Sequence, residues 1–425
     1  MAFLHEHIIL PLSDLLGGEQ VHKYLRLLKE AEGWTPEQMD VFQQERLHKL
    51  LKYAATEVPF YRDWFHSHSL DPQTTLLNQL PIVSKSIMRQ EGIERFTAEQ
   101  FPVKQRISSR SSGSTGEPFS YYVSKKANSV NTAAKLRTWY IAGYRLGDRY
   151  MKITNGKRSS TIKKVQDRIN NCLFVPFNSI TDDILESILK QIEHERPLFI
   201  RAYPSPLFLL AQYRNNHPGY TFRPRHIMTT GSTLPDAYRA EIEKAFGCDI
   251  IDSYSCEGTP NTYETPTHDG YNITYYYGII EVLDNNNQPV TNGIGRVIST
   301  DLWNMAQPFI RYDTQDLVEV KNGLISRIIG RQSDTFIHTN GQLYTSHNFS
   351  HYFLYDVTGI DNYQIHRHAD NTITFYIVTN REFKPDTTQK IIHYWQKCLS
   401  VPVSVNIVNS IPLKHNNKHQ IIVND

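Results

Sequence analysis

Ser-Ser-Gly-Ser-Thr-Gly-Glu-Pro, residues 111–118, is the stretch around which the rest of the chain is organised. Glycine lacks a Cβ, so the backbone can turn through positive φ and present successive N–H groups to an anion, while Ser and Thr hydroxyls add donors. The same composition is also typical of a flexible connector. Alternating apolar and polar residues at 119–123, and a helical pattern that begins near Ala127, favour a phosphate-binding loop inside a folded domain. The loop is not a Walker loop, because no Lys-Ser/Thr pair follows Gly116.

The overall composition is that of an ordinary globular protein. The 425 residues are 40% hydrophobic and 21% charged, which is enough for two or three domains with their own cores. The formal net charge is only +2, from 45 basic and 43 acidic residues, so we expect no nucleic-acid partner. None of the four cysteines forms a C-x-x-C pair, and we expect reduced thiols and a cytoplasmic location.

The N-terminal residues predict neither export nor a membrane span. His-Glu-His at residues 5–7 stands where a signal peptide has its basic region, and Pro11 and Asp14 interrupt the apolar run that follows. No segment approaches the roughly 20 apolar residues of a transmembrane helix. Residues 8–16 fit either a peripheral helix that rests on a membrane surface or a helix packed on the first domain. The packed helix is the favoured interpretation.

Strand and helix patterns alternate through the middle of the chain. We expect strands at 150–154, 198–202 and 226–230 and helices at 127–143, 181–195, 206–215 and 235–246. This alternation predicts an α/β fold with a mainly parallel sheet. Ligands of such sheets bind outside the carboxyl ends of the strands. The turn Gly231-Ser232-Thr233 and the segment 252–258 follow predicted strands, so both are candidates to share a cleft with residues 111–118.

The flanking regions have different patterns. Residues 18–55 are helical, with Thr35 as an expected N-cap. Short strands, including a hairpin that pairs 279–283 with 296–300, dominate residues 273–329. We therefore expect a large N-terminal domain at 1–331 that contains this β-rich subdomain, followed by a small, mobile α+β lobe at 332–425.

A long and specific motif lies between residues 300 and 316. It reads Thr-Asp-Leu-x-Asn, then Pro308, then Ile-Arg-Tyr-x-Thr-x-Asp. With residues 111–118, Ser253 to Gly258, Gly330-Arg331, Asn340-Gly341 and Lys418, it resembles the adenylate-forming ligase superfamily. Within that superfamily the chain is most similar to the phenylacetate-CoA ligase and CapK-type capsular polysaccharide branch. The resemblance covers almost the whole chain.

The resemblance implies an enzyme that activates a carboxylate with ATP and Mg²⁺. An acyl-adenylate forms with loss of pyrophosphate, and an amine or a thiol then displaces AMP. An amine acceptor would give an amide in surface polysaccharide assembly, whereas CoA as acceptor would give an acyl-CoA or aryl-CoA ligase. A nucleotide-binding scaffold without turnover is the third interpretation.

The resemblance also implies roles for individual residues. The phosphates are assigned to Ser111, Ser112, Gly113, Ser114, Thr115 and Gly116. The rest of the nucleotide site is assigned to Gly231, Ser232, Ser253, Tyr254, Asp316 and Arg331, with Asp316 on the ribose hydroxyls and Arg331 on the ribose or the phosphate. Glu257 is assigned to Mg²⁺ and to catalysis, because carboxylate oxygens suit this hard ion. Lys418 is assigned to bridge the carboxylate and the α-phosphate. Lys414 is its rival.

Four positions depart from the family pattern. Tyr254, assigned by the resemblance to stack on adenine, lies one residue closer to the glutamate than expected. Gln315 and Asn417 stand where the family has glycine, and Ser333 replaces the first of two hinge acids. These changes keep the scaffold interpretation open. The change at Ser333 also favours a polysaccharide-linked amine over CoA, because thioester formation requires the C-terminal lobe to rotate.

Overall fold

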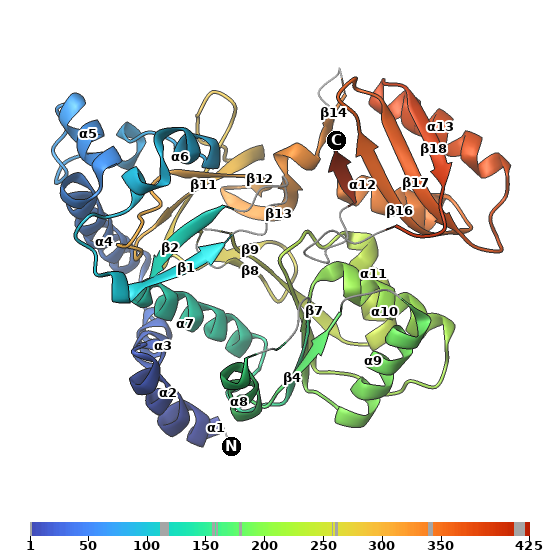
Figure 1. The fold of residues 1–425 in the computed structure, drawn as a ribbon, viewed down its shortest axis with the longest axis horizontal. Coiled ribbons are helices and arrows are strands. Elements are labelled where there is room, and N and C mark those ends of the chain that lie inside the picture. The colour runs from blue at the N-terminus through green and yellow to red at the C-terminus, as the bar shows by residue number, and fades with distance from the viewer. Residues whose placement is uncertain are drawn as a thin grey trace. The chain divides into compact units, whose positions relative to one another are not determined.

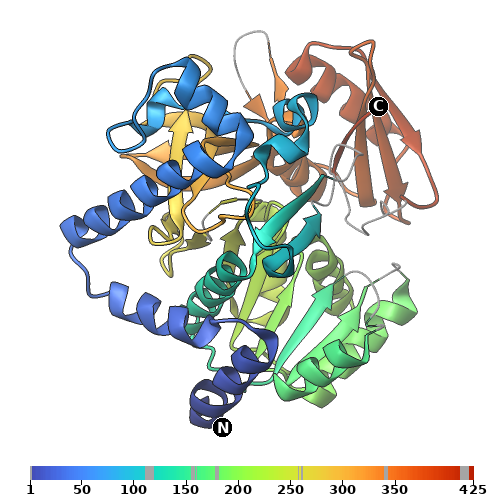
Figure 2. The same cartoon turned by 60° about the vertical axis from the view of Figure 1, so that its left-hand side comes forward.

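The protein was analysed as a computed structural model, which describes residues 2–110, 119–154, 158, 160–177, 181–256, 258–259, 262–338, 343–411 and 421–425. The chain forms two compact units (Figures 1 and 2). Unit 1 contains residues 1–148 and 253–327, and unit 2 contains residues 149–252 and 328–425. The division into residues 1–331 and 332–425 stays a prediction about which part of the chain moves.

Unit 1 begins with helices. They are α1 (Ala2–Leu4), η1 (His5–Ile9), α2 (Leu10–Gly17), α3 (Val21–Ala31), α4 (Pro36–Glu57), α5 (Pro59–Ser67), η2 (Leu77–Gln79), α6 (Lys85–Glu91), η3 (Ile93–Phe96) and η4 (Val103–Gln105). Thr35 caps α4 as expected: its hydroxyl accepts from the Gln38 N–H, and the Gln38 side chain accepts from the Thr35 N–H. This reciprocal pair satisfies two donors at the helix start.

The first three helical segments pack on unit 1 through polar side chains. His5 and Asp14 are buried, and the Glu6 carboxylate accepts from Lys29 and from the Tyr140 hydroxyl. Large apolar side chains of this region are exposed instead, namely Phe3, Leu4, Ile8, Leu12, Leu15 and Leu16. Residues 8–16 thus form a helix that packs on the first domain, which was the favoured interpretation. The apolar side of this helix, however, does not face the core. No helix among the described residues is long and apolar enough to cross a membrane.

Three antiparallel arrangements complete unit 1. The strands β1 (Arg106–Arg110) and β2 (Ser120–Ser124) pair antiparallel, and β2 leads into helix α7 (Lys125–Ile141). The strands β10 (Gly278–Leu283), β11 (Gly293–Asp301), β12 (Tyr312–Lys321) and β13 (Leu324–Arg331) form a four-stranded sheet in this order. The last part of β13, from Ile328 on, belongs to unit 2. The pairing of β10 with β11 confirms the predicted hairpin. Two short strands, β8 (Thr262–Glu264) and β9 (Tyr271–Ile273), also pair antiparallel.

The first part of unit 2 is an α/β layer. Its strands lie in the order β4 (Cys172–Pro176), β3 (Tyr150–Thr154), β5 (Phe199–Ala202), β6 (His226–Thr230) and β7 (Asp249–Tyr254). The pairs β4–β3, β3–β5 and β5–β6 are parallel. Helices α9 (Asp182–Glu195), α10 (Pro204–Asn216) and α11 (Asp236–Phe246) contribute to one core with the strands, and Figure 1 shows all three on the same side of them. The predicted α/β fold class is confirmed.

Two elements of this layer were absent from the sequence-based prediction. They are helix α8 (Thr161–Ile169) and the edge strand β4. No residue of α8 is buried, so the helix has no apolar face directed at a core. The alternation of the chain therefore contains one more helix–strand unit than predicted, inserted between β3 and α9.

The second part of unit 2 is a small α+β lobe, as expected. It contains η5 (Gln332–Asp334), β14 (Phe336–Ile337), β15 (Leu343–Tyr344), α12 (Ser346–His351), η6 (Tyr352–Asp356), β16 (Ile360–Arg367), β17 (Ile373–Thr379), α13 (Asp386–Leu399), β18 (Val403–Ile407) and β19 (Ile422–Asn424). Its main sheet has the order β18-β17-β16-β19. The aromatic side chains of Phe349, Phe375 and Trp395 pack together in its core.

Candidate active site

The long motif forms the end of β11, the start of β12 and the connection between them. Its polar side chains are buried: Asp301, Asn304, Arg311, Thr314 and Asp316 are each no more than 6% exposed. Buried polar groups cost stability unless they are hydrogen-bonded. The partners of these side chains therefore show what the motif holds in place.

Asn304 ties the motif to the strand that closes the loop at 111–118. Its Oδ1 accepts from the Ser124 N–H at 2.9 Å, and its Nδ2 donates to the carbonyl oxygens of Tyr122 and Gln307, both at 2.9 Å. The Gln307 Oε1 in turn accepts from the Tyr122 N–H at 2.8 Å. Both backbone polar groups of Tyr122 in β2, the N–H and the carbonyl oxygen, are thus hydrogen-bonded to side chains of the motif. The motif pattern does not reveal this role of Asn304, because two of its partners lie 180 and 182 residues away in the sequence.

Asp301 organises the connection itself. One carboxylate oxygen accepts from the N–H groups of Trp303 at 2.8 Å and Asn304 at 3.1 Å, and the other accepts from the Tyr277 hydroxyl at 3.1 Å. Burial raises the pKa of this carboxyl to about 6, although the hydrogen bonds favour its charged form. The Asp301 carboxylate is a structural group that shapes the turn before Asn304.

Arg311 joins the motif to the preceding helical region. Its guanidinium donates to both carboxylate oxygens of Glu281, at 3.1 and 2.9 Å, and to the carbonyl oxygens of Asn78 and Leu80 at 3.2 and 2.9 Å. Its backbone N–H donates to the Thr300 hydroxyl at 3.0 Å. A planar guanidinium with fixed donors suits this paired geometry.

Asp316 and Tyr254 lie together in unit 1. The Tyr254 hydroxyl donates to Asp316 Oδ2 at 2.8 Å. The Asp316 N–H donates to the Thr314 hydroxyl at 3.1 Å, and that hydroxyl donates to the Val297 carbonyl oxygen at 2.9 Å. Burial, followed by the negative charge of Asp316, raises the pKa of the Tyr254 hydroxyl well above its usual range. The hydroxyl therefore stays protonated and acts as a donor to the carboxylate.

Gln315, which stands where the family pattern has glycine, has an unusual backbone conformation. Gln315 adopts φ +60°, the left-handed conformation that glycine enters without a steric penalty. A side chain in this conformation costs on the order of 1–2 kcal/mol. The turn between Thr314 and Asp316 is thus retained without the glycine, and the surrounding hydrogen bonds hold it.

The backbone beyond Tyr254 packs against the same motif. Gly258 has φ +70°, and a Cβ at this position would lie 2.7 Å from the Phe309 side chain. The Gly258 carbonyl oxygen accepts from the Ser299 hydroxyl at 3.0 Å. Only glycine fits here, because both the conformation and the contact exclude a side chain. Tyr254 and Gly258 are therefore each bonded to the β11–β12 region.

The structure places the other predicted residues as follows. Ser253 is in β7 and pairs with Tyr263 of β8. Gly231 and Ser232 are exposed after β6 in unit 2, and Gly231 has φ +81°. Arg331 ends β13 in unit 2 and precedes η5. The predicted phosphate-loop residues 111–116, the predicted Mg²⁺ ligand Glu257 and the catalytic candidate Lys418 with its rival Lys414 lie outside the described residues. Among the predicted residues that the structure describes, Tyr254 and Asp316 are brought into direct contact.

Comparison with known sequences gives relatives along most of the chain. No profile of a known protein family matches it. Protein CapK of Staphylococcus aureus is 24% identical over 412 residues, which cover 90% of this chain and 88% of the relative. Phenylacetate-coenzyme A ligase of Pseudomonas putida is 27% identical over 344 residues, which cover 73% of this chain and 74% of the relative.

Solved structures share the fold. A 2-hydroxyisobutyryl-CoA ligase in the postadenylation state matches with a TM-score of 0.71 and 18% identity, over 90% of this chain and 89% of that structure. The amide bond synthetase McbA from Marinactinospora thermotolerans matches with a TM-score of 0.53 and 15% identity, over 74% of this chain and 68% of that structure. The chain is thus similar along most of its length to CapK and to phenylacetate-CoA ligase, and it shares the fold of these solved ligases.

Proposed function

We propose that this chain activates a carboxylate with ATP and transfers the acyl group to an amine in surface polysaccharide assembly. A carboxylate oxygen attacks the α-phosphorus of ATP, the bond to the β-phosphate oxygen breaks, and pyrophosphate leaves. The amine nitrogen then attacks the acyl carbon, the bond to AMP breaks, and the nitrogen loses a proton. An amide and AMP are the products.

The observation that carries the adenylation step is the geometry around Asp316. The carboxylate is 5% exposed, lies at the start of β12, and receives a hydrogen bond from Tyr254. It belongs to the same motif as Asn304, which fixes the strand that follows the Ser/Gly loop. A buried carboxylate suits the two hydroxyls of a ribose, because it accepts up to four hydrogen bonds. Tyr254 takes one of these positions and orients the carboxylate, a role that adds to the predicted adenine contact.

The remaining assignments rest on the family pattern. Glu257 would hold Mg²⁺, which supplies charge neutralisation between the phosphates and the incoming carboxylate. Lys418 would donate to the carboxylate and the α-phosphate as these two anions approach. The amine acceptor is supported by the match to CapK over 90% of this chain and by the fold shared with an amide bond synthetase.

A CoA ligase is the second candidate function. It is favoured by the relative named phenylacetate-coenzyme A ligase and by the fold shared with 2-hydroxyisobutyryl-CoA ligase. The test is a screen of aryl, fatty, amino and uronic acids for AMP production, with either CoA or amines as acceptor. Amide product formed without CoA is expected. Robust CoA-dependent AMP release without any amide would overturn the amine assignment, and absence of pyrophosphate release with every acid would leave only the scaffold interpretation.

The catalytic lysine is tested separately. Lys418→Ala is expected to retain ATP binding and to slow pyrophosphate release by roughly 10²–10³-fold, the usual effect of deleting one preorganised charged donor. Single-turnover pyrophosphate release measures this step. Lys414→Ala is the matched control, because it removes the same charge four residues earlier. Loss in the Lys414 variant alone would reassign the role.

A further inference from the structure

Helix α8 and the edge of the sheet beside it form a strongly basic region of unit 2. Residues 149–174 contain a single acid, Asp167, whereas the whole chain has a net charge of only +2. The basic residues of this segment are Arg149, Lys152, Lys157, Arg158, Lys163, Lys164 and Arg168. Such a local excess in a nearly neutral protein indicates a surface that attracts anions.

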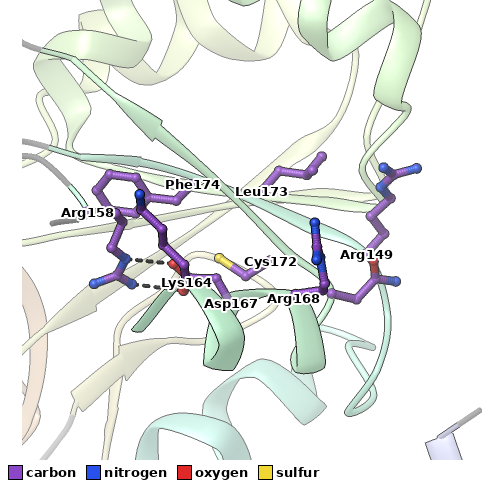
Figure 3. A pocket seen from close by; sticks show the side chains of 9 residues that line it. Arg149, Arg158, Lys164, Asp167, Arg168, Cys172, Leu173 and Phe174 are labelled. Carbon is purple, nitrogen blue, oxygen red and sulfur yellow. Dashed lines mark hydrogen bonds and ion pairs between the residues drawn. The ribbon is translucent and has the colours of Figure 1, made fainter. Parts of the chain in front are cut away.

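A cavity of about 400 Å³ lies between α8 and β4. Figure 3 shows the side chains that line it: Arg149, Arg158, Lys164, Asp167, Arg168, Asn171, Cys172, Leu173 and Phe174. Four of them are cations and one is a carboxylate. The volume lies in the range of small-molecule sites, and the charge selects for an anionic group.

The cations of this cavity are held to different degrees. Arg158 makes a two-point ion pair with Asp167, at 2.6 and 2.9 Å, and its guanidinium lies 4.4 Å from the centre of the Phe174 ring. Arg149 pairs with Glu195. Lys164 and Arg168, by contrast, have no side-chain partner among the residues that the structure describes. One end of the cavity is therefore rigid, and two cations on α8 are available to a ligand.

Cations also crowd the neighbouring strands. Lys152 of β3 lies beside Phe174 in the register of β3 with β4, and beside Arg201 in the register of β3 with β5. Burial, and then the positive charges of Arg201 and Arg158, lowers the pKa of Lys152 to about 8. An anion bound nearby would relieve this repulsion.

The other side of α8 carries an apolar stripe that faces solvent. Ile162, Val165 and Ile169 are 72%, 52% and 45% exposed, and their spacing places them on one helix face. Lys164 and Arg168 flank the stripe on the side of the cavity. A short helix with exposed apolar residues beside cations has the composition of a helix that lies at a membrane surface.

We propose that α8 and its cavity bind the phosphate headgroups of an anionic lipid surface. Lys164 and Arg168 receive the phosphate beside the ion-paired guanidinium groups of Arg149 and Arg158. The apolar stripe of Ile162, Val165 and Ile169 enters the boundary between headgroups and acyl chains. The cavity alone would also accept a free phosphate ester. The stripe beside it decides for the lipid, because a soluble phosphate gives exposed apolar side chains no partner.

The experiment is co-sedimentation of the full chain with vesicles of phosphatidylcholine containing 30% phosphatidylglycerol, and with phosphatidylcholine alone. Binding is expected only with the anionic vesicles and is expected to weaken as salt is raised. Lys164→Glu with Arg168→Glu is expected to weaken binding by on the order of thirtyfold or more, since each basic residue near the surface contributes roughly a factor of five to ten. Ile162→Ser with Val165→Ser is expected to weaken it by on the order of tenfold.

Lys49→Glu with Lys52→Glu on α4 is the matched control, because both lysines are exposed and lie outside α8. Far-UV circular dichroism and pyrophosphate release should be unchanged in all three double variants, which separates this inference from the proposed enzyme activity. Inorganic phosphate and glycerol 3-phosphate are the soluble probes. Failure to bind anionic vesicles, equal binding by the α8 variants, equal loss in the α4 control, or saturable binding of the soluble phosphates alone would each overturn the lipid assignment.

Discussion

The β11–β12 motif and helix α8 are both rich in polar residues, but they use them in opposite ways. Asp301, Asn304 and Arg311 are buried, and each side chain has at least three hydrogen bonds to other residues. Lys164 and Arg168 of α8 are exposed and have no side-chain partner among the described residues. Buried polar groups whose hydrogen bonds are all made hold the local geometry in place. Exposed charges without a partner contribute little to the fold, and they can instead bind a ligand of opposite charge. Substitutions in the two regions should therefore differ in what they damage.

The largest expected effect is on stability, at Arg311. Arg311→Met removes the cation and leaves the Glu281 carboxylate without its partner in a mostly buried position. We expect the free energy of unfolding to fall by about 3–5 kcal/mol, the usual loss when one member of a buried ion pair is removed. Urea denaturation measures it. Arg327→Met is the control, because its ion pair with Glu319 is half exposed and should contribute within about 1 kcal/mol. If both variants lost the same free energy of unfolding, burial would not explain the stability that the two ion pairs contribute.

The next effect is on nucleotide binding, at Asp316. Asp316→Ala is expected to weaken ATP binding by about 1.5–3 kcal/mol, because it removes the hydrogen-bond acceptor assigned to the ribose. Calorimetric titration measures the affinity. Tyr254→Phe deletes only the hydroxyl that orients the carboxylate and should cost about 0.5–1.5 kcal/mol. Unchanged affinity in a folded Asp316→Ala protein would remove the ribose assignment.

A pH dependence is expected from Asp301. Its pKa in the folded chain, about 6, lies above the ordinary value of 3.8, so the folded state holds the proton more tightly than the unfolded state does. Between these two values the free energy of unfolding should fall as pH rises, with a slope of at most about 1.4 kcal/mol per pH unit from this group. Below 3.8 and above 6 its contribution does not change. Asp301→Asn should flatten this part of the profile, measured by urea denaturation from pH 4 to 7. An unchanged slope would contradict the assignment.

The smallest effect is expected on the stability of α8 variants. Lys164→Ala and Arg168→Ala should change the free energy of unfolding by no more than about 0.5 kcal/mol, because neither side chain loses a partner within the part of the chain that the structure describes. Urea denaturation beside the vesicle assay gives the comparison. Losses above about 1 kcal/mol would show that these cations stabilise the fold. The contrast between α8 and the β11–β12 motif would then not hold.

The sequence predicted the elements whose apolar residues face a core. The helix at 181–195 and the strand at 226–230 were expected within one residue of α9 and β6, because their apolar positions pack into the same core. Helix α8 was not predicted, although Ile162, Val165 and Ile169 recur at helical spacing, and in the structure these apolar residues face solvent. The apolar positions of α9 and β6 are buried, as their sequence pattern predicts. The apolar positions of α8 are exposed, although they too lie at helical spacing.

The same limit applies to the candidate site. The motif at 300–316 predicted that Asp316 matters, but the contact of its carboxylate with Tyr254 joins positions 62 residues apart. The contacts of Asn304 with Tyr122 and Ser124 span about 180 residues. Pairings at such separations depend on how the strands come together and leave no periodic trace in the sequence.

The hydrogen bonds of the Asn304 side chain exclude other amino acids at its position. Its oxygen meets a donor and its nitrogen meets two acceptors, each at 2.9 Å, so both amide protons are engaged at once. Aspartate has the right shape but would place a negative oxygen against two carbonyl groups, and glutamine is one methylene too long for a buried site. The two side-chain amide protons of Asn304 should consequently exchange with solvent deuterium far more slowly than those of a surface asparagine. Their exchange would report, from a single residue, whether the strand that closes the Ser/Gly loop stays attached while the enzyme turns over.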